Sequence, residues 1–195
     1  MMIINPYRFA GGLGTLLYDT FTDTDTTALS AHTPDINNTS DVWTLVYSSN
    51  LQILSNQVKP VGSDVLYLID VGVTDVTMLT TAFRLSNNSS SYIKFVARAP
   101  SSVNTGWGVF GARDGVLLLY EGVTSRATGT TTLVQNTNYK LEVIYSGTSI
   151  KVYLDDSLEI DHTITTTESY GTHAGIQLSK LSYQSSMEDI LITNP

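Results

Sequence analysis

Apolar and polar residues alternate along most of this chain, and the alternation is clearest between Asn138 and Asp155. Because a strand places successive side chains on opposite faces, a period of two predicts strands. Gly147 suits the first central position of a two-residue type II′ turn, so we predict a hairpin closed by Ser146 and Ser149. Its apolar face pairs Tyr145 with Ile150, Val143 with Val152 and Leu141 with Leu154. One apolar and one polar face predict an antiparallel sheet that covers a core on one side.

The same alternation predicts strands at Val65–Asp70, at residues 76–85 and at Tyr92–Ala99. The segment 76–85 is long and apolar on both faces, which indicates a central position in a sheet. The third segment has three apolar residues on one face, Ile93, Phe95 and Ala97, and two cations expected on the other, Lys94 and Arg98.

A second hairpin is expected over residues 107–121, because Asp114-Gly115 is a strong signal for a two-residue turn. This turn would place Phe110 opposite Leu119 and Val109 opposite Tyr120. Further alternating segments follow towards the C-terminus. No segment combines the spacing of an amphipathic helix with helix caps, so the predicted fold class is all-β.

The chain has 195 residues, which fits one domain. The alternation of apolar and polar residues predicts one continuous β domain over residues 16–195. Residues 1–15 are interpreted as an N-terminal arm, whose apolar and aromatic side chains are Ile3, Ile4, Tyr7 and Phe9. A glycine-rich hinge follows them. An apolar arm ahead of a hinge needs a surface to cover it. Two interpretations stay open: the arm docks on a neighbouring subunit, or it is a first strand that closes the sandwich.

Composition and charge narrow the range of partners. Hydrophobic residues make up 42% of the chain and charged residues 14%, so Ser, Thr and Asn must build much of the polar surface. The net charge of -8 would repel a phosphate backbone, which argues against a nucleic-acid partner. No segment approaches the roughly 20 apolar residues of a membrane span, and none has the features of a secretory signal. The lack of cysteine excludes disulfides and thiolate chemistry.

Two blocks of sequence resemble a known family. The first is residues 19–35, DTFTDTDTTALSAHTPD, followed by Trp43; the second runs from Tyr139 through the Gly147 turn to Glu188-Asp189-Ile190. Together they resemble the concanavalin A-like (laminin-G-like) jelly roll, as found in bacteriophage tail and head appendage proteins. The resemblance implies a β-sandwich of two antiparallel sheets. The chain departs from the family at Asp156, where a glycine is common at the end of the hairpin.

The resemblance implies a non-enzymatic virion structural protein, an appendage or decoration module made in the host cytoplasm and carried on the particle. Other virion proteins, further copies of the chain and a host surface glycan are the partners it implies. Because this fold hosts many activities, two alternatives stay open: a free-standing carbohydrate-binding lectin and, less favoured, a glycan hydrolase.

Catalytic and metal-binding patterns are weak. The Glu-x-Asp-x-x-Glu run of glycan-cleaving relatives does not occur, and no Gly-x-Ser-x-Gly elbow marks a serine hydrolase. We therefore expect no catalytic residues. The three histidines lack metal-ligand spacing, so core or surface roles are favoured over zinc. Four carboxylates crowd the first block, Asp19, Asp23, Asp25 and Asp35, but they lack the glycine and distal glutamate of a calcium loop. Ordinary turn chemistry is favoured over structural calcium, and no other cofactor is expected.

A sugar site needs an aromatic face with hydrogen-bonding groups beside it. Trp107, after the polar loop 101–106, is the best candidate for an exposed aromatic face, with Tyr92 and Arg98 on the adjacent strand. The alternative for Trp107 is a half-buried aromatic at a strand end. Trp43 is predicted to anchor the core instead.

Overall fold

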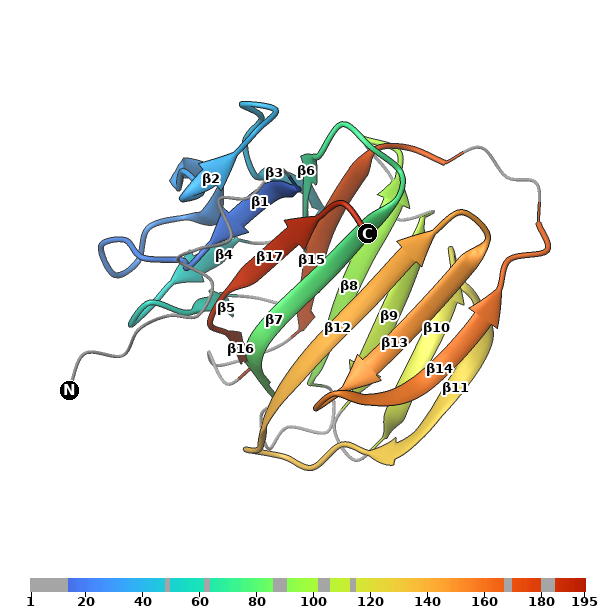
Figure 1. The fold of residues 1–195 in the computed structure, drawn as a ribbon. Helices are drawn as coiled ribbons and strands as arrows, with labels where there is room; N and C mark the ends of the chain where they lie inside the picture. Colours follow the sequence, from blue (N-terminus) through green and yellow to red (C-terminus); the bar gives the residue numbers. More distant parts are fainter. Residues whose placement is uncertain are drawn as a thin grey trace.

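The computed structural model describes residues 14–47, 50–61, 64–85, 91–101, 106–112, 115–166, 170–179 and 185–195. Over these residues the chain forms two antiparallel sheets that pack face to face (Figure 1). The predicted all-β fold class is therefore confirmed. Residues 1–13, which include the arm residues Ile3, Ile4, Tyr7 and Phe9, lie outside the described part of the chain. Among the described residues, no helix has the length and apolar character needed to cross a membrane.

The first sheet has ten strands. They are β1 (Thr15–Asp19), β2 (Ile36–Asn37), β4 (Leu51–Ile53), β5 (Val58–Pro60), β7 (Val76–Arg84), β12 (Asn138–Ser146), β13 (Ser149–Leu154), β14 (Ser157–Thr163), β16 (Ser186–Met187) and β17 (Ile190–Thr193). The long strand β7 pairs with β12 on one side and with β16 and β17 on the other, so its predicted central position is confirmed.

The second sheet has seven strands, in the order β11-β10-β9-β8-β15-β6-β3. They are β3 (Thr44–Tyr47), β6 (Val65–Asp70), β8 (Tyr92–Ala99), β9 (Trp107–Ala112), β10 (Val116–Glu121), β11 (Thr124–Thr132) and β15 (His173–Ser179). The core lies between the two sheets and holds both tryptophans, Trp43 and Trp107, each 1% exposed. The prediction that Trp43 anchors the core is confirmed.

The hairpin of β12 and β13 has the register that its alternation predicts. Tyr145 pairs with Ile150, Val143 with Val152, Leu141 with Leu154, and Ser146 with Ser149. Gly147 has φ of +53°, as the first central position of a type II′ turn requires. The paired apolar residues are buried in the core, which explains why this register holds.

The hairpin of β9 and β10 differs from its prediction by one residue. Phe110 lies opposite Leu118, not Leu119, and Val109 lies opposite Leu119, not Tyr120. In this register Val109 and Leu119 both enter the core, each fully buried. Phe110 and Tyr120 then face outward and are half-buried. A shift of one residue exchanges the two faces of a strand, so burial against the other sheet outweighs the local turn signal.

Arg98 also differs from its prediction, which placed it beside Lys94 on the outer face of β8. Arg98 has φ of +55°, and the pairing of β8 with β15 shifts register at this point. Such a bulge lets two successive side chains point to one side. The guanidinium reaches the other sheet instead, where Nη2 donates to Asp75 Oδ1 at 2.7 Å and to the Gly147 carbonyl at 2.8 Å.

Candidate functional site

A pocket of about 280 Å³ opens on the outer face of the seven-stranded sheet, the face that points away from the core. Its lining comes from four neighbouring strands and one turn: Tyr92 and Lys94 of β8, Phe110 of β9, Tyr120 of β10, Gln177 of β15, and Gly122 and Val123 between β10 and β11. Alternation explains this gathering, because the residues between them enter the core. Examples are Ile93, Val109 and Ile176, each no more than 1% exposed.

Three aromatic rings form one wall of the pocket. The Tyr92 and Phe110 ring centroids are 4.8 Å apart with an interplanar angle of 40°, and those of Phe110 and Tyr120 are 6.0 Å apart at 75°. Rings at these separations stabilise one another beyond the area they bury. Because each ring stands on a different strand of a regular sheet, the wall is held by backbone pairing and not by a loop.

Two polar side chains lie at the floor of the pocket. Lys94 of β8 pairs across the sheet with Gln177 of β15 on one side and with Phe110 of β9 on the other. Gln177 Nε2 donates to the Tyr92 hydroxyl at 2.7 Å, which fixes both the amide and the ring. Both polar side chains are buried, at no more than 6% exposed, so they form a fixed part of the pocket.

Gly108 makes room for the lysine. A Cβ atom at this position would lie 2.1 Å from Cε of Lys94, so the end of the lysine side chain lies directly over the glycine backbone. Burial lowers the pKa of Lys94 to about 8, because the ammonium loses part of its hydration.

The three residues predicted for sugar binding do not meet at one surface. Tyr92 lines the pocket. Trp107 is 1% exposed and packs inside the sandwich against the ring of His162 at 5.5 Å, so the exposed aromatic face expected of it is not found. Arg98 is 3% exposed, and its guanidinium forms an ion pair with Asp75 beside the other sheet. Sequence reasoning missed Phe110 and Tyr120, because the predicted register of their hairpin was wrong by one residue.

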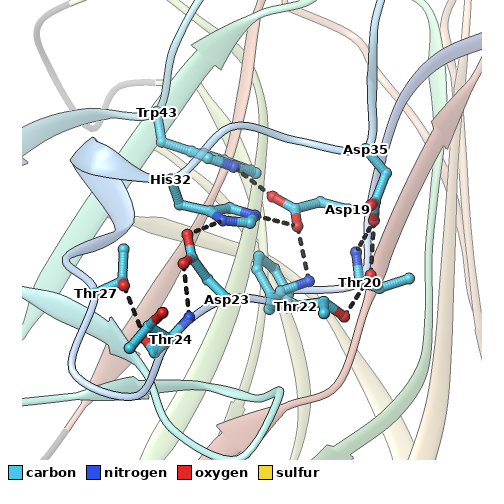
Figure 2. A network of polar contacts seen from close by, with 10 residues as sticks. Asp19, Thr20, Thr22, Asp23, Thr24, Thr27, His32, Asp35 and Trp43 are labelled. Atoms are coloured by element: carbon cyan, nitrogen blue, oxygen red, sulfur yellow. Dashed lines mark hydrogen bonds and ion pairs between the residues drawn. The ribbon is translucent and has the colours of Figure 1, made fainter.

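A second polar site lies in the loop after β1, where His32 stands between two carboxylates (Figure 2). His32 Nε2 is 2.8 Å from Asp19 Oδ1, and Nδ1 is 3.1 Å from Asp23 Oδ2. Asp19 also accepts the indole N–H of Trp43 at 2.8 Å and the backbone N–H of Phe21 at 2.8 Å. Asp19, Asp23, His32 and Trp43 therefore form one network.

The two carboxylates favour the protonated form of His32. Burial opposes protonation of His32, but the hydrogen bonds and charges of Asp19 and Asp23 outweigh it and raise the pKa of the ring. The hydrogen bond from His32 and the Thr24 backbone N–H lower the pKa of Asp23. Both ring nitrogens bind carboxylates, so His32 has no nitrogen left to activate a nucleophile. Its arrangement anchors the loop on the Trp43 indole.

The other two carboxylates of the loop have separate partners. Asp35 accepts the backbone N–H and the hydroxyl of Thr20, at 2.8 and 2.7 Å. Asp25 accepts the backbone N–H of Ser55 at 2.7 Å. Within the described ranges, no three acidic or histidine side chains have an arrangement that could hold a metal ion. The four aspartates of the sequence block thus cap backbone and hydroxyl donors.

Comparison with known sequences identifies no relative: no protein-family model matches the chain, and no curated protein matches it. Comparison with solved structures does. The chain is similar to the carbohydrate-binding module CBM66 from Bacillus subtilis, at 18% identity and a TM-score of 0.57, over 78% of this chain and 92% of that chain.

Two further structures give the same TM-score of 0.57. One is the Emp47p carbohydrate recognition domain, at 13% identity over 87% of this chain and 94% of that chain. The other is the exoplasmic/lumenal domain of VIP36 in its Ca²⁺-bound form, at 12% identity over 88% of this chain and 90% of that chain. At such identities the likeness concerns the fold, and the chain folds as a lectin-like jelly roll of two antiparallel sheets.

Proposed function

We propose that this chain is a carbohydrate-binding module whose site is the pocket on the outer face of the seven-stranded sheet. The observation that carries the proposal is the wall of Tyr92, Phe110 and Tyr120 beside the buried polar floor of Lys94 and Gln177. Aromatic rings pack against the C–H faces of sugar rings, and a few fixed polar groups orient the hydroxyls. The names of the similar structures, a carbohydrate-binding module and a carbohydrate recognition domain, support the same function.

Binding without hydrolysis fits the lining of this pocket. Glycoside hydrolysis generally needs two carboxyl groups that flank the scissile bond. The seven residues that line the pocket include neither aspartate nor glutamate. The acidic cluster of the sequence that most resembles such a pair is Asp155-Asp156, and it lies at the exposed turn between β13 and β14. We therefore propose a binding module and not an enzyme.

The test is glycan binding by wild-type protein and by Tyr120→Ala, first on an array and then by calorimetry with the glycans that bind. Removing the Tyr120 ring from the aromatic wall should weaken binding about tenfold or more. Tyr153→Ala is the matched control, because Tyr153 is a half-buried tyrosine on the outer face of the other sheet. Equal affinity of the two variants, or no binding of any glycan by the wild type, would refute the proposal.

We propose further that the module works on a bacteriophage particle, as an appendage or decoration protein attached through residues 1–15. The resemblance of the sequence to phage appendage proteins supports this, as does the apolar arm that precedes the domain. The arm would contact other virion proteins or further copies of the chain. A free-standing lectin is the alternative.

Deletion of residues 1–12 separates the two roles. If the arm attaches the module, the truncated chain should disappear from purified particles, as measured by mass spectrometry, while its glycan affinity stays unchanged. Undiminished incorporation into particles would exclude attachment through the arm. Absence of the full-length chain from particles, combined with glycan binding, would favour the free-standing lectin.

A further inference from the structure

We propose that the pocket prefers sugars that carry a methyl group, either attached to C5 in a 6-deoxyhexose or within an N-acetyl group, and that this methyl group packs against Val123. The inference rests on the proposed function and names the class of sugar that the same site takes.

The first observation is the exposure of Val123. This valine lines the pocket and is 92% exposed, whereas the other exposed large hydrophobic side chains of the described residues are between 38% and 55% exposed. Single exposed apolar residues are ordinary on a protein surface. Val123 differs because it lines the same pocket as the rings of Phe110 and Tyr120. It therefore extends the apolar wall to the rim, where a bound ligand would cover it.

The second observation is the turn that holds this valine. Glu121 and Thr124 close a two-residue turn between β10 and β11, and Gly122 has φ of +56°, as the first central position of a type II′ turn requires. The Gly122 N–H also donates to the Gly106 carbonyl at 3.0 Å, which ties the turn to the residue before β9. The second central position of such turns usually carries a polar residue. The backbone therefore fixes the position of Val123 without requiring an apolar side chain there.

The third observation is that polar and apolar groups lie at different ends of the pocket. The hydrogen bond between Gln177 and Tyr92 joins β15 to β8. Val123 follows β10, which is the third strand from β15 in the sheet and lies about 14 Å from it, because adjacent strands are about 4.8 Å apart. A valine side chain has no hydrogen-bonding group. A sugar hydroxyl that packs against it loses water without gaining a partner, whereas a methyl group gains burial.

A sugar that lies against the aromatic wall therefore meets polar groups at one edge and an apolar rim at the other. Replacing a hydroxyl by a methyl-bearing group at the edge that faces Val123 should strengthen binding about fivefold to twentyfold, the range expected for the burial of one methyl group.

The experiment uses three matched pairs of monosaccharides coupled to serum albumin. They are L-rhamnose against L-mannose, L-fucose against L-galactose, and N-acetyl-D-glucosamine against D-glucose. Surface plasmon resonance with the full chain measures the affinities. At least one methyl-bearing sugar should bind about fivefold to twentyfold more tightly than its hydroxyl counterpart. The pair that shows the preference identifies the source of the methyl group, and glycans that bind on the array should contain the same kind of sugar.

Val123→Thr tests the contact itself. Threonine has the shape of valine but replaces one methyl group by a hydroxyl, and at a position 92% exposed it should not affect folding. It should reduce the preference to about twofold or less and leave the affinity for the hydroxyl counterpart unchanged. Val134→Thr is the matched control, because Val134 is 52% exposed, lies outside the lining of the pocket and follows the end of β11 that is remote from the turn. It should leave every affinity unchanged.

The outcomes separate the two proposals. Binding that depends on Tyr120 but is equal within every pair, or array glycans that bind without a methyl-bearing sugar, would overturn the preference and leave the binding function standing. An unchanged affinity of Val123→Thr for the methyl-bearing sugar, alone or within an array glycan, would also overturn it, as would an equal loss in Val134→Thr. Failure of every conjugate and every array glycan to bind would refute both proposals.

Discussion

Lys94 is a buried lysine that lines the pocket on the outer face of the seven-stranded sheet. Burial lowers its pKa to about 8, so the charge of this side chain changes between pH 7 and 9.

His32 gives a prediction for stability at the residue scale. Its pKa is raised in the folded protein, so its contribution to stability is fully present below about 6.5, the value in an unfolded chain, and is lost as the pH rises through the folded value. His32→Gln should therefore cost about 1 to 2 kcal/mol at pH 5.5 and clearly less at pH 9. Urea unfolding at the two pH values measures the difference.

The contribution of Asp23, a carboxylate partner of His32, to stability depends on pH with the opposite sign. The pKa of Asp23 is lowered, so its contribution is present above about 3.8 and is lost as the pH falls through the folded value. Asp23→Asn should reduce the pH dependence of wild-type stability between pH 6 and 9, because it removes one of the two groups that raise the His32 pKa. A cost of His32→Gln that does not vary with pH would show that folding leaves the pKa of His32 unchanged, against the raised value expected here.

At the scale of elements, the two turns of the β12-β13-β14 meander differ in their backbone requirement. Gly147 in the first turn has φ of +53°, which glycine adopts freely. In the second turn Asp155 and Asp156 have φ of +48° and +67°, so both central residues are left-handed, as in a type I′ turn. Asp156 thus takes a conformation that the family resemblance associates with glycine.

Asp156→Gly should therefore stabilise the protein by about 0.5 to 1 kcal/mol. The substitution removes the strain of a left-handed aspartate, and it gives up an ion pair with Lys140 that is mostly exposed and worth little. Gly147→Ala should destabilise by about 1 kcal/mol, through strain alone, because a Cβ there meets no neighbouring atom. Thermal and urea unfolding measure both, and a loss of stability in Asp156→Gly would contradict the argument.

At the scale of the whole molecule, polar contacts outside the apolar core help to join the two sheets. Arg98 of the seven-stranded sheet binds Asp75 and the Gly147 carbonyl beside the ten-stranded sheet. At the open edges of the two sheets, Glu159 of β14 accepts hydrogen bonds from the backbone N–H groups of Thr130 and Thr131 on β11, at 2.7 and 2.9 Å. Both threonine hydroxyls add to the same carboxylate.

Glu159→Gln should cost about 1 to 2 kcal/mol, because charge-assisted hydrogen bonds to the edge strand are weakened. The matched control is Glu142→Gln, a half-buried glutamate on the outer face of β12. Chemical unfolding measures the free energies, and hydrogen exchange should show faster opening of β11 in the Glu159 variant only. Equal effects of the two substitutions would mean that the contact between the edges contributes nothing specific.

Local alternation alone determined the all-β class, most strand positions and the register of the β12-β13 hairpin, because its turn type and its burial pattern agree. Only the tertiary structure decided the register of β9 and β10, the inward turn of Arg98 and the burial of Trp107. A turn signal is compatible with registers one residue apart, and a bulge leaves no mark in the alternation, so contact with the opposite sheet selects between the faces. The pocket follows from that selection, since the same shift that buries Val109 and Leu119 brings Phe110 and Tyr120 out beside Lys94.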